Sequence, residues 1–305
     1  MISQYNIDTK INLQIGDPMD QGCSHMVHNV LYQYANINAI TIPVRVTAED
    51  LENAIIGARA FGLDFTLTMP HKSTIIEYLD EVDTMSREFR CVNNVKYVDG
   101  KLIGTGLDGV GMGAAIRHRL GESMDGRRAL ILGAGAVAGP IAAAIVERGV
   151  NDIVIANRTI EKAEYIEGVL KKYFPEIQVK SGPLTEEFLN AEAPTCTIVV
   201  QCTSMGGGAW EEFHPLSFME LLPKDCLIAD VLYPKTTVLT EAQRLGLETL
   251  NGQEMILHQQ LATMEFRFGV KLPEEALLVA EEALDMSVAK RAFRNRMKAK
   301  EKQNG

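Results

Sequence analysis

The sequence predicts an α/β protein with two domains, an N-terminal α/β domain and a Rossmann-type domain built on a doubly wound parallel sheet. Three observations predict this class. The chain has 305 residues, 46% of them apolar, which is enough for two hydrophobic cores. Short β-rich runs alternate with helical patterns along most of the chain. A glycine-rich turn at 133–138 separates one of these runs from the helical pattern that follows it.

The first hundred residues predict a sheet of their own. Five short runs have the composition of strands, and helical patterns separate the first four of them. The strands are expected at 11–15, 39–46, 63–67, 94–98 and 101–105, and the helices at 25–35, 48–59 and 73–79. A helix over 109–120, ended by Gly121, can then connect the two domains.

The middle of the chain predicts the parallel sheet. Its strands are expected at 128–133, 153–157, 177–180, 197–201 and 226–230, with helices at 138–148, 160–173, 185–190, 216–221 and 237–245. Strands separated by helices of this length favour right-handed crossovers. The end of the chain predicts helices at 253–267 and, with interruptions, at 273–300. We therefore expect one domain at 1–108 plus 250–305 and a second at 109–249.

Composition excludes several classes of protein. The net charge of −10 disfavours non-specific nucleic-acid binding. Five cysteines without a C-x-x-C pair favour neither a disulfide framework nor a zinc site, and they indicate a reducing cytoplasm. The histidines have no metal-like spacing, so no metal is expected. The chain begins without a basic segment and an apolar segment in succession, so we expect no secretion signal.

Two further segments call for an interpretation. Residues 129–146 are uncharged, but four of these eighteen are Gly or Pro, which favours a strand, a turn and a helix over a membrane span. Residues 286–305 hold seven Lys or Arg and one acidic residue. This tail predicts a solvated, fraying helix, with an RNA-binding or docking arm as the alternative.

The run Gly133-Ala134-Gly135-Ala136-Val137-Ala138 has the G-x-G-x-x-A spacing of a dinucleotide-binding turn. The first glycine permits the tight turn, and the second lets the backbone approach a pyrophosphate. The small third residue lets the helix pack closely. The N–H groups and dipole of the helix N-terminus then face the phosphates. A purely structural glycine turn is the alternative.

The end of the next strand indicates which dinucleotide binds. NAD-binding units usually carry an acidic residue here to hold the ribose 2′-hydroxyl. This chain has Asn157-Arg158-Thr159, followed by Lys162. Arg158 can stack on adenine and hold a 2′-phosphate, which a carboxylate would repel. The pattern favours NADP over NAD. The alternative is that Arg158 is only a surface residue at a helix start.

Polar residues also follow the ends of several strands in the N-terminal domain and recur near the end of the chain. They occur in the segments 16–29, 66–72, 90–94, 104–108 and 252–259. In order and spacing these segments, together with those beginning at Gly133, Asn157 and Asp230, resemble eight motifs of the shikimate dehydrogenase family, which includes quinate/shikimate dehydrogenases.

The resemblance implies an NADP-dependent oxidoreductase of the shikimate pathway of aromatic amino acid biosynthesis, with the substrate held between two domains. It would interconvert a ring hydroxyl and a ketone of a shikimate-like hydroxy acid. Lys72 and Asp108 match the catalytic pair. The other matches are Thr68, Asn93 and Gln259 at the hydroxyl edge of the substrate, Ser24 and Tyr233 at its carboxylate end, and Thr203 and Met255 at the cofactor. Family members occur as monomers and dimers, so a homodimer is possible.

The chemistry of a carbinol supports this pair independently. When hydride leaves, the hydroxyl proton needs a base within hydrogen-bond reach. Lys72 precedes a predicted helix, whose dipole would favour the neutral amine, as would burial. Asp108 would oppose that shift and orient the amine, so we expect the two groups to titrate as a unit. Taken singly, Lys72 could be a solvated lysine and Asp108 the cap of the helix at 109–120.

The residues matched to the reacting hydroxyl of the substrate keep the family motifs, and the departures occur at other positions. Gly22 replaces the first serine of the substrate-binding loop, between Gln21 and His25, which also depart from the pattern. Thr66 replaces an asparagine, Gly106-Leu107 replace Asn-Thr, and Gln201 replaces another asparagine. The chain is one residue short after Tyr233. Losing a hydrogen bond to a charged group costs ~1.5–3 kcal/mol. We therefore expect an altered substrate preference, with quinate or an aminoshikimate-type compound as an alternative substrate and a non-catalytic NADP-binding sensor as an alternative function.

Overall fold

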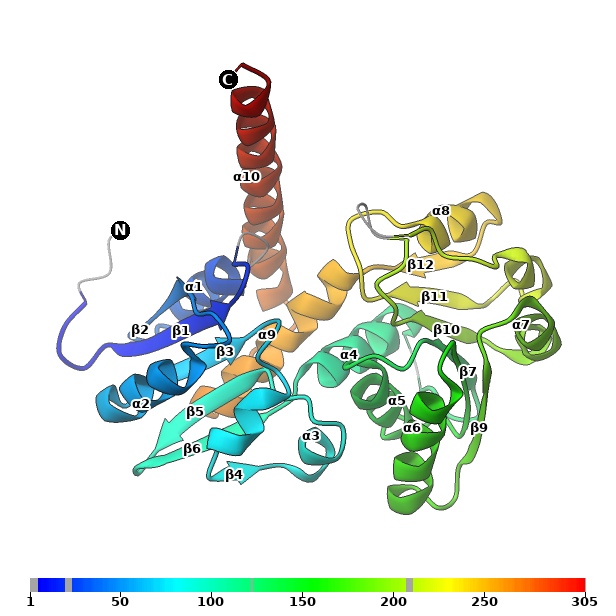
Figure 1. Ribbon diagram of the computed structural model, residues 1–305, viewed down its shortest axis with the longest axis horizontal. Helices are drawn as coiled ribbons and strands as arrows, with labels where there is room; N and C mark the ends of the chain where they lie inside the picture. The colour runs from blue at the N-terminus through cyan, green and yellow to red at the C-terminus, as the bar shows by residue number, and fades with distance from the viewer. Residues whose placement is uncertain (1–4, 20–23, 122, 207–210, 305) are drawn as a thin grey trace. The chain divides into compact units, whose positions relative to one another are not determined.

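The computed structural model describes residues 5–19, 24–121, 123–206 and 211–304, with side chains described as far as residue 297. It confirms the predicted α/β class, with two six-stranded sheets (Figure 1). The chain divides into two compact units. Unit 1 contains Met1–Leu107 and Gln260–Gly305, and unit 2 contains Asp108–Gln259.

Unit 1 contains a mixed sheet in the order β2-β1-β3-β5-β6-β4. Strand β1 is parallel to β2 and β3, β5 is antiparallel to β3 and β6, and β4 is parallel to β6. Strands β1 to β6 span Lys10–Gly16, Ala39–Arg45, Asp64–Leu67, Glu81–Val82, Asn94–Val98 and Lys101–Thr105. Helices α1 (Ser24–Tyr34), α2 (Leu51–Phe61) and α10 (Ala276–Asn304) belong to the same unit, as does most of α9 (Gly252–Phe268).

The sheet of unit 1 has one apolar face and one polar face, because successive strand residues point to opposite sides. On the apolar face, Ile15, Phe65 and Val95 pack with the buried side of α2 in one core cluster. The polar face carries buried Asn12, Gln14, Thr41, Thr66 and Asn94. Side chains of α1 and α9 hydrogen-bond to this face.

Unit 2 contains a parallel sheet, as the sequence predicted, and its strand order is β12-β11-β10-β7-β8-β9. Strands β7 to β12 span Arg128–Leu132, Asp152–Asn157, Gln178–Pro183, Ile198–Gln201, Leu227–Asp230 and Glu248–Leu250. Helices lie on both faces of this sheet (Figure 1). They are α4 (Asp108–Leu120), α5 (Ala138–Val146) and α6 (Ile160–Tyr173) on one face and α7 (Glu186–Glu192) and α8 (Thr237–Arg244) on the other.

Several predicted elements differ from the observed ones. The helices expected at 73–79 and 216–221 are short 3₁₀ turns, Thr74–Tyr78 and Ser217–Leu221. The interruptions expected in 273–300 are wrong, because α10 is continuous. The edge strands β4 and β12, the helix α3 (Thr84–Glu88) and the turn η2 (Ala193–Thr195) were not predicted. Elements of two to five residues are too short to show a period in the sequence.

The uncharged run at 129–146 forms most of β7, the glycine turn and α5, as the positions of its Gly and Pro residues indicated. Within the described part of the chain, no helix has both the length and the apolar composition needed to cross a bilayer.

Candidate active site

The glycine turn follows β7, the strand of unit 2 at which the strand order of the sheet reverses. The neighbours of β7 are β8 on one side and β10 on the other, and ligands of open α/β sheets bind at such a switch point. Gly133 has φ +98°, and a Cβ there would lie 2.6 Å from Thr203 Cγ2. A Cβ at Gly135 would meet only the Cys202 carbonyl oxygen, at an ordinary 3.5 Å. The fold therefore requires a glycine at 133 but not at 135.

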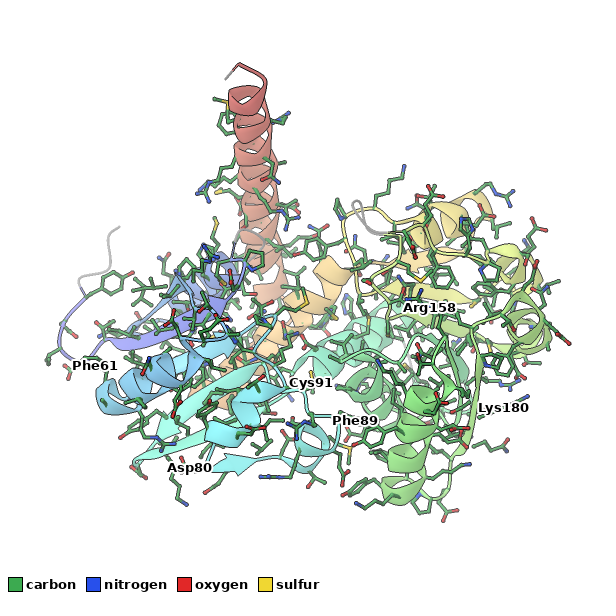
Figure 2. The ribbon with its side chains drawn as sticks, in the orientation of Figure 1. Phe61, Asp80, Phe89, Cys91, Arg158 and Lys180 are labelled. Carbon is green, nitrogen blue, oxygen red and sulfur yellow. The ribbon has the colours of Figure 1, made fainter. Side chains whose placement is uncertain are left out.

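The end of β8 supports the glycine turn. Asn157 accepts a hydrogen bond from the Ala134 N–H at 3.0 Å and donates one to the Thr159 carbonyl at 2.8 Å. Arg158, the next residue, is exposed and forms no ion pair with the residues that the structure describes (Figure 2). Lys162, in the first turn of α6, is also exposed. Two cationic side chains thus lie in solvent beside the segment that holds the Ala134 N–H.

Thr203 lies in the loop after β10, and Gln201 holds this loop in place. The fully buried Gln201 amide donates to the carbonyl oxygens of Thr203 and Met205 and accepts from the Thr203 N–H. Because the Thr203 methyl borders Gly133, this loop and the glycine turn are neighbours. Gln201 replaces the asparagine of the family motif, and its side chain, longer than that of asparagine, stabilises the loop that carries Thr203 beside Gly133.

Asp108 and Gln259, predicted from separate motifs, contact each other in unit 2. The Gln259 side-chain amide donates a hydrogen bond of 2.8 Å to Asp108 Oδ1. Both side chains are buried, at 5% and 6% exposure. Asp108 is the first residue of α4, and Gln259 lies on α9 one turn after the buried Met255. A carboxylate and an amide 151 positions apart in the sequence thus form one buried polar pair.

In unit 1, backbone hydrogen bonds bring Thr68, Lys72 and Asn93 together. The Val92 N–H donates to the Lys72 carbonyl, and the Leu67 N–H donates to the Asn93 carbonyl. Asn93 is 2% exposed, and its side-chain oxygen accepts from the Leu107 N–H at 2.8 Å and from the Asn94 amide at 3.1 Å. With this oxygen occupied by two donors, the Asn93 amide nitrogen is the group left to bind a ligand as a donor.

The local structure around Lys72 corrects one expectation. Lys72 is half-buried and precedes a 3₁₀ turn of five residues instead of an α-helix. Such a turn aligns few peptide dipoles, so the helix dipole expected to favour the neutral amine contributes little. Burial and neighbouring charges are the remaining influences on this amine.

Ser24 and Tyr233, both expected at the carboxylate end of the substrate, belong to different units. Ser24 opens α1 in unit 1 and is half-buried. Tyr233 follows β11 in unit 2, where its ring packs against Gly252. Gln21 and Gly22 lie outside the described residues. His25 accounts for part of the altered loop, because its N–H and ring both contact the Gln14 side-chain oxygen, at 2.8 and 3.2 Å.

The buried polar face of unit 1 was missed from the sequence. Arg267 donates to Tyr32, Thr66 and Asn94 at 3.4, 3.0 and 3.0 Å, all of them neutral oxygens. Asn12 donates to Thr41 and Thr66. The signal was present in β1, where polar Asn12 and Gln14 alternate with apolar residues in a buried strand. Through Asn94, this network reaches the side chain of Asn93.

Asp230 was also missed, although its motif was noticed. It ends β11 fully buried, and its carboxylate accepts from the Leu232 N–H at 2.9 Å and from the Thr236 hydroxyl at 2.7 Å. Burial raises the pKa of this carboxyl from 3.8 to about 7. An acidic residue at the end of an otherwise apolar strand was the available signal. Asp230 fixes the loop that carries Tyr233.

The cysteine and histidine side chains in the described part of the chain form no metal-binding site. No three His, Cys, Asp or Glu side chains there gather as metal ligands. The described cysteines Cys91, Cys196, Cys202 and Cys226 are buried and unlinked. Burial raises the pKa of the Cys196 thiol to about 12, so this cysteine stays a protonated core residue.

Two family models and several known proteins match this chain. The substrate binding domain model of shikimate dehydrogenase matches residues 14–95, and the shikimate/quinate 5-dehydrogenase model matches residues 115–208. The shikimate dehydrogenase (NADP(+)) of Symbiobacterium thermophilum is 32% identical over 87% of this chain and 91% of its own length.

Two solved structures are similar over nearly the whole chain. A shikimate dehydrogenase in complex with NADP+ is 30% identical, with a TM-score of 0.78 over 92% of this chain and 96% of that one. The ligand-free 5-ketofructose reductase of a Gluconobacter strain is 28% identical, with a TM-score of 0.80 over 92% of this chain and 99% of that one.

The raised pKa of Asp230 predicts a pH-dependent stability. Because its folded-state pKa lies above its unfolded value, the contribution of this carboxyl is full below pH 3.8 and is lost as the pH rises through about 7. Relative to Asp230→Asn, the parent protein should lose free energy of unfolding between about pH 4 and pH 7, by at most about 1.4 kcal/mol per pH unit. Urea unfolding across this range measures the difference. The exposed Glu187→Gln should match the parent, and a pH-independent difference for Asp230→Asn would contradict the assignment.

Proposed function

The chain belongs to the shikimate dehydrogenase family, and on this premise we propose that it is an NADP-dependent oxidoreductase acting on a shikimate-like alicyclic hydroxy acid. In one direction it oxidises shikimate to 3-dehydroshikimate and produces NADPH. The observation that carries the proposal is the buried contact between Asp108 and Gln259, since two positions predicted from separate family motifs meet there and burying a carboxylate is costly.

NADP fits the residues around the glycine turn. The bound nicotinamide would accept or deliver the hydride. The backbone from Gly133 to Val137 would hold the pyrophosphate, and the missing side chain at Gly135, which the fold does not require, leaves room for that group. Asn157 fixes the Ala134 N–H, and Arg158, Thr159 and Lys162 would hold the 2′-phosphate. Thr203 and Met255 would complete the cofactor side.

Lys72 and Asp108 would carry the proton chemistry. The Lys72 amine takes the proton of the reacting hydroxyl as the hydride leaves, and Asp108 orients the amine and stabilises its charged form. Gln259 holds Asp108 in place. Asn93 donates from its amide nitrogen to a substrate oxygen, because its own oxygen is already occupied. Thr68 would bind the same hydroxyl edge. This division assigns proton transfer to Lys72, its support to Asp108 and Gln259, and substrate binding to Asn93 and Thr68.

The opposite end of the substrate would meet Ser24 and Tyr233. With Gly22 in the place of a serine, this end offers one hydroxyl donor fewer than the family motif. The binding energy available for a carboxylate is correspondingly lower. Quinate and aminoshikimate-type compounds share the carboxylate and remain alternative substrates.

A second candidate substrate class is neutral polyhydroxy ketones, which do not need the carboxylate donor that is missing at Gly22. Thr66, which replaces the family's asparagine, has its hydroxyl bonded to Asn12 and Arg267 on the polar face of the sheet. The similarity to a 5-ketofructose reductase supports this class, since that enzyme is named for a substrate without a carboxylate. A pure NADP-binding sensor is disfavoured, because it would have no need of Lys72 and Asp108.

The reducing cytoplasm is the compartment we propose for this activity. The unlinked state of the four described cysteines supports it. A small-molecule substrate is the partner that the activity requires.

A substrate screen tests the proposed function. We expect NADP+-dependent turnover of shikimate, followed by nicotinamide absorbance. A kcat/KM for shikimate above those for quinate oxidation and 5-ketofructose reduction would contradict the altered substrate preference. The highest kcat/KM on 5-ketofructose would replace the first substrate class by the second. Cofactor binding without turnover of any of the three would contradict the proposed oxidoreductase and favour the sensor.

The assignment of Arg158 predicts a change in cofactor preference. Arg158→Ala removes charge-assisted hydrogen bonds worth ~1.5–3 kcal/mol, so kcat/KM for NADP+ should fall roughly ten- to a hundredfold. The value for NAD+, which lacks the 2′-phosphate, should stay within about twofold. Lys171→Ala, an exposed cation near the other end of α6, serves as the control and should change neither value. Equal losses for the two cofactors would refute the role of Arg158.

A further inference from the structure

Helix α10 packs against unit 1 along one side only. Its buried residues are Ala276, Ala280, Ala283, Leu284 and Ser287, spaced by three or four positions, and α1 is the helix it contacts. From Ala289 to Met297 every described side chain is exposed except that of Arg291, which is half-buried. Figure 1 shows α10 continuing well beyond α1 and the sheet of its own unit. This helix is therefore far longer than its intramolecular packing requires.

The opposite side of α10 carries a stripe of exposed apolar residues. Leu278, Met286, Phe293 and Met297 are exposed by 69%, 48%, 57% and 43%. At 3.6 residues per turn they fall within an arc of about 100°, which faces away from the buried side. We call these four residues the outer face of α10. Single exposed apolar residues are ordinary, but four on one stripe of one helix indicate a binding surface.

Charges on α10 are divided between its two halves. The exposed residues Glu281, Glu282 and Asp285 lie in the first half. Basic residues fill the second half, with Lys290, Arg291, Arg294 and Arg296 in its described part. A helix dipole favours this order only within the first and last turns, and these charges extend several turns from the ends. The helix is thus complementary in charge to a reversed copy of itself.

We propose that the outer face of α10 is a dimerisation surface, which packs antiparallel against the same face of a second copy. A two-fold axis near the small residue Ala289 lets the helices approach closely and places Phe293 within one turn of the partner's Met286. The same arrangement brings Arg296 beside the partner's Glu282. A parallel pairing would set acidic residues against acidic residues and basic against basic, so the charges select the antiparallel arrangement.

Such an interface is isologous, because both copies use the same face: Phe293 of each copy lies near the partner's Met286. It uses no residue assigned to the proposed active site, so its failure would leave the proposed function untouched. An anionic membrane surface is the other class of partner that a basic helix end could bind, and the acidic first half of α10 disfavours it.

Sedimentation equilibrium of the full chain tests the proposal. The parent protein should have the mass of two chains at micromolar concentration, and Phe293→Glu should have the mass of one chain with kcat within about twofold of the parent. Phe61→Glu is the matched control, since Phe61 is an exposed phenylalanine on α2 of the same unit (Figure 2). It should remain a dimer. A monomeric parent, or a dimer unchanged by Phe293→Glu, would overturn the proposal.

Charge reversal tests the antiparallel pairing itself. Arg296→Glu and Glu282→Arg should each weaken the dimer at least tenfold, and the double variant should recover most of the loss. Additive losses in the double variant would contradict the pairing.

Co-sedimentation with phosphatidylcholine vesicles containing phosphatidylglycerol tests membrane binding as the alternative. Retention of a monomeric parent protein on these vesicles would mean that α10 binds a membrane instead of a second copy.

Discussion

The buried hydrogen bond between the Gln259 amide and the Asp108 carboxylate is the interaction on which the proposed chemistry depends. It requires α9 to approach α4 closely, and Gly111 makes that approach possible. A Cβ at this position would lie 2.5 Å from the Met255 carbonyl oxygen and 2.8 Å from Gln259 Cβ. A carboxylate buried without donors would be costly, and the Gln259 amide supplies one of the donors of Asp108. The geometry of the proposed catalytic carboxylate thus depends on Gly111, a residue without a side chain.

The cofactor side of unit 2 follows the same logic of close approach. Gly133 is required by the fold, because its φ is positive and Thr203 lies against it. Gly135 is not required by any neighbour within the described part of unit 2, which leaves an external group as the reason for a glycine there. The Asn157 side chain then links this turn to the strand end that carries Arg158. The fold itself requires Gly133, whereas Gly135 is explained by the space that the proposed ligand needs.

Local patterns allowed much of this to be predicted from the sequence. The turn at Gly133 and the strand end at Asn157 depend on neighbouring residues, and both were located correctly. The contact between Asp108 and Gln259 spans 151 positions, so periodicity could not predict it and only the family resemblance grouped the two. The polar face of unit 1 was missed, because Asn12 and Gln14 do not look like residues of a buried strand. The segment after Lys72 was expected to be an α-helix, but its five residues form a 3₁₀ turn.

In the proposed NADP-dependent dehydrogenase, Lys72 transfers the proton and Asp108 orients the Lys72 amine. The most direct test of these two roles is to measure, for Lys72→Ala and Asp108→Asn, both the turnover of the substrate preferred by the parent enzyme and the affinity for NADP+. A positioned general base contributes about 10²–10⁴-fold, so kcat should fall by that factor in each variant. The dissociation constant of NADP+ should stay within about threefold of the parent value. A kcat close to that of the parent in either variant would contradict the account.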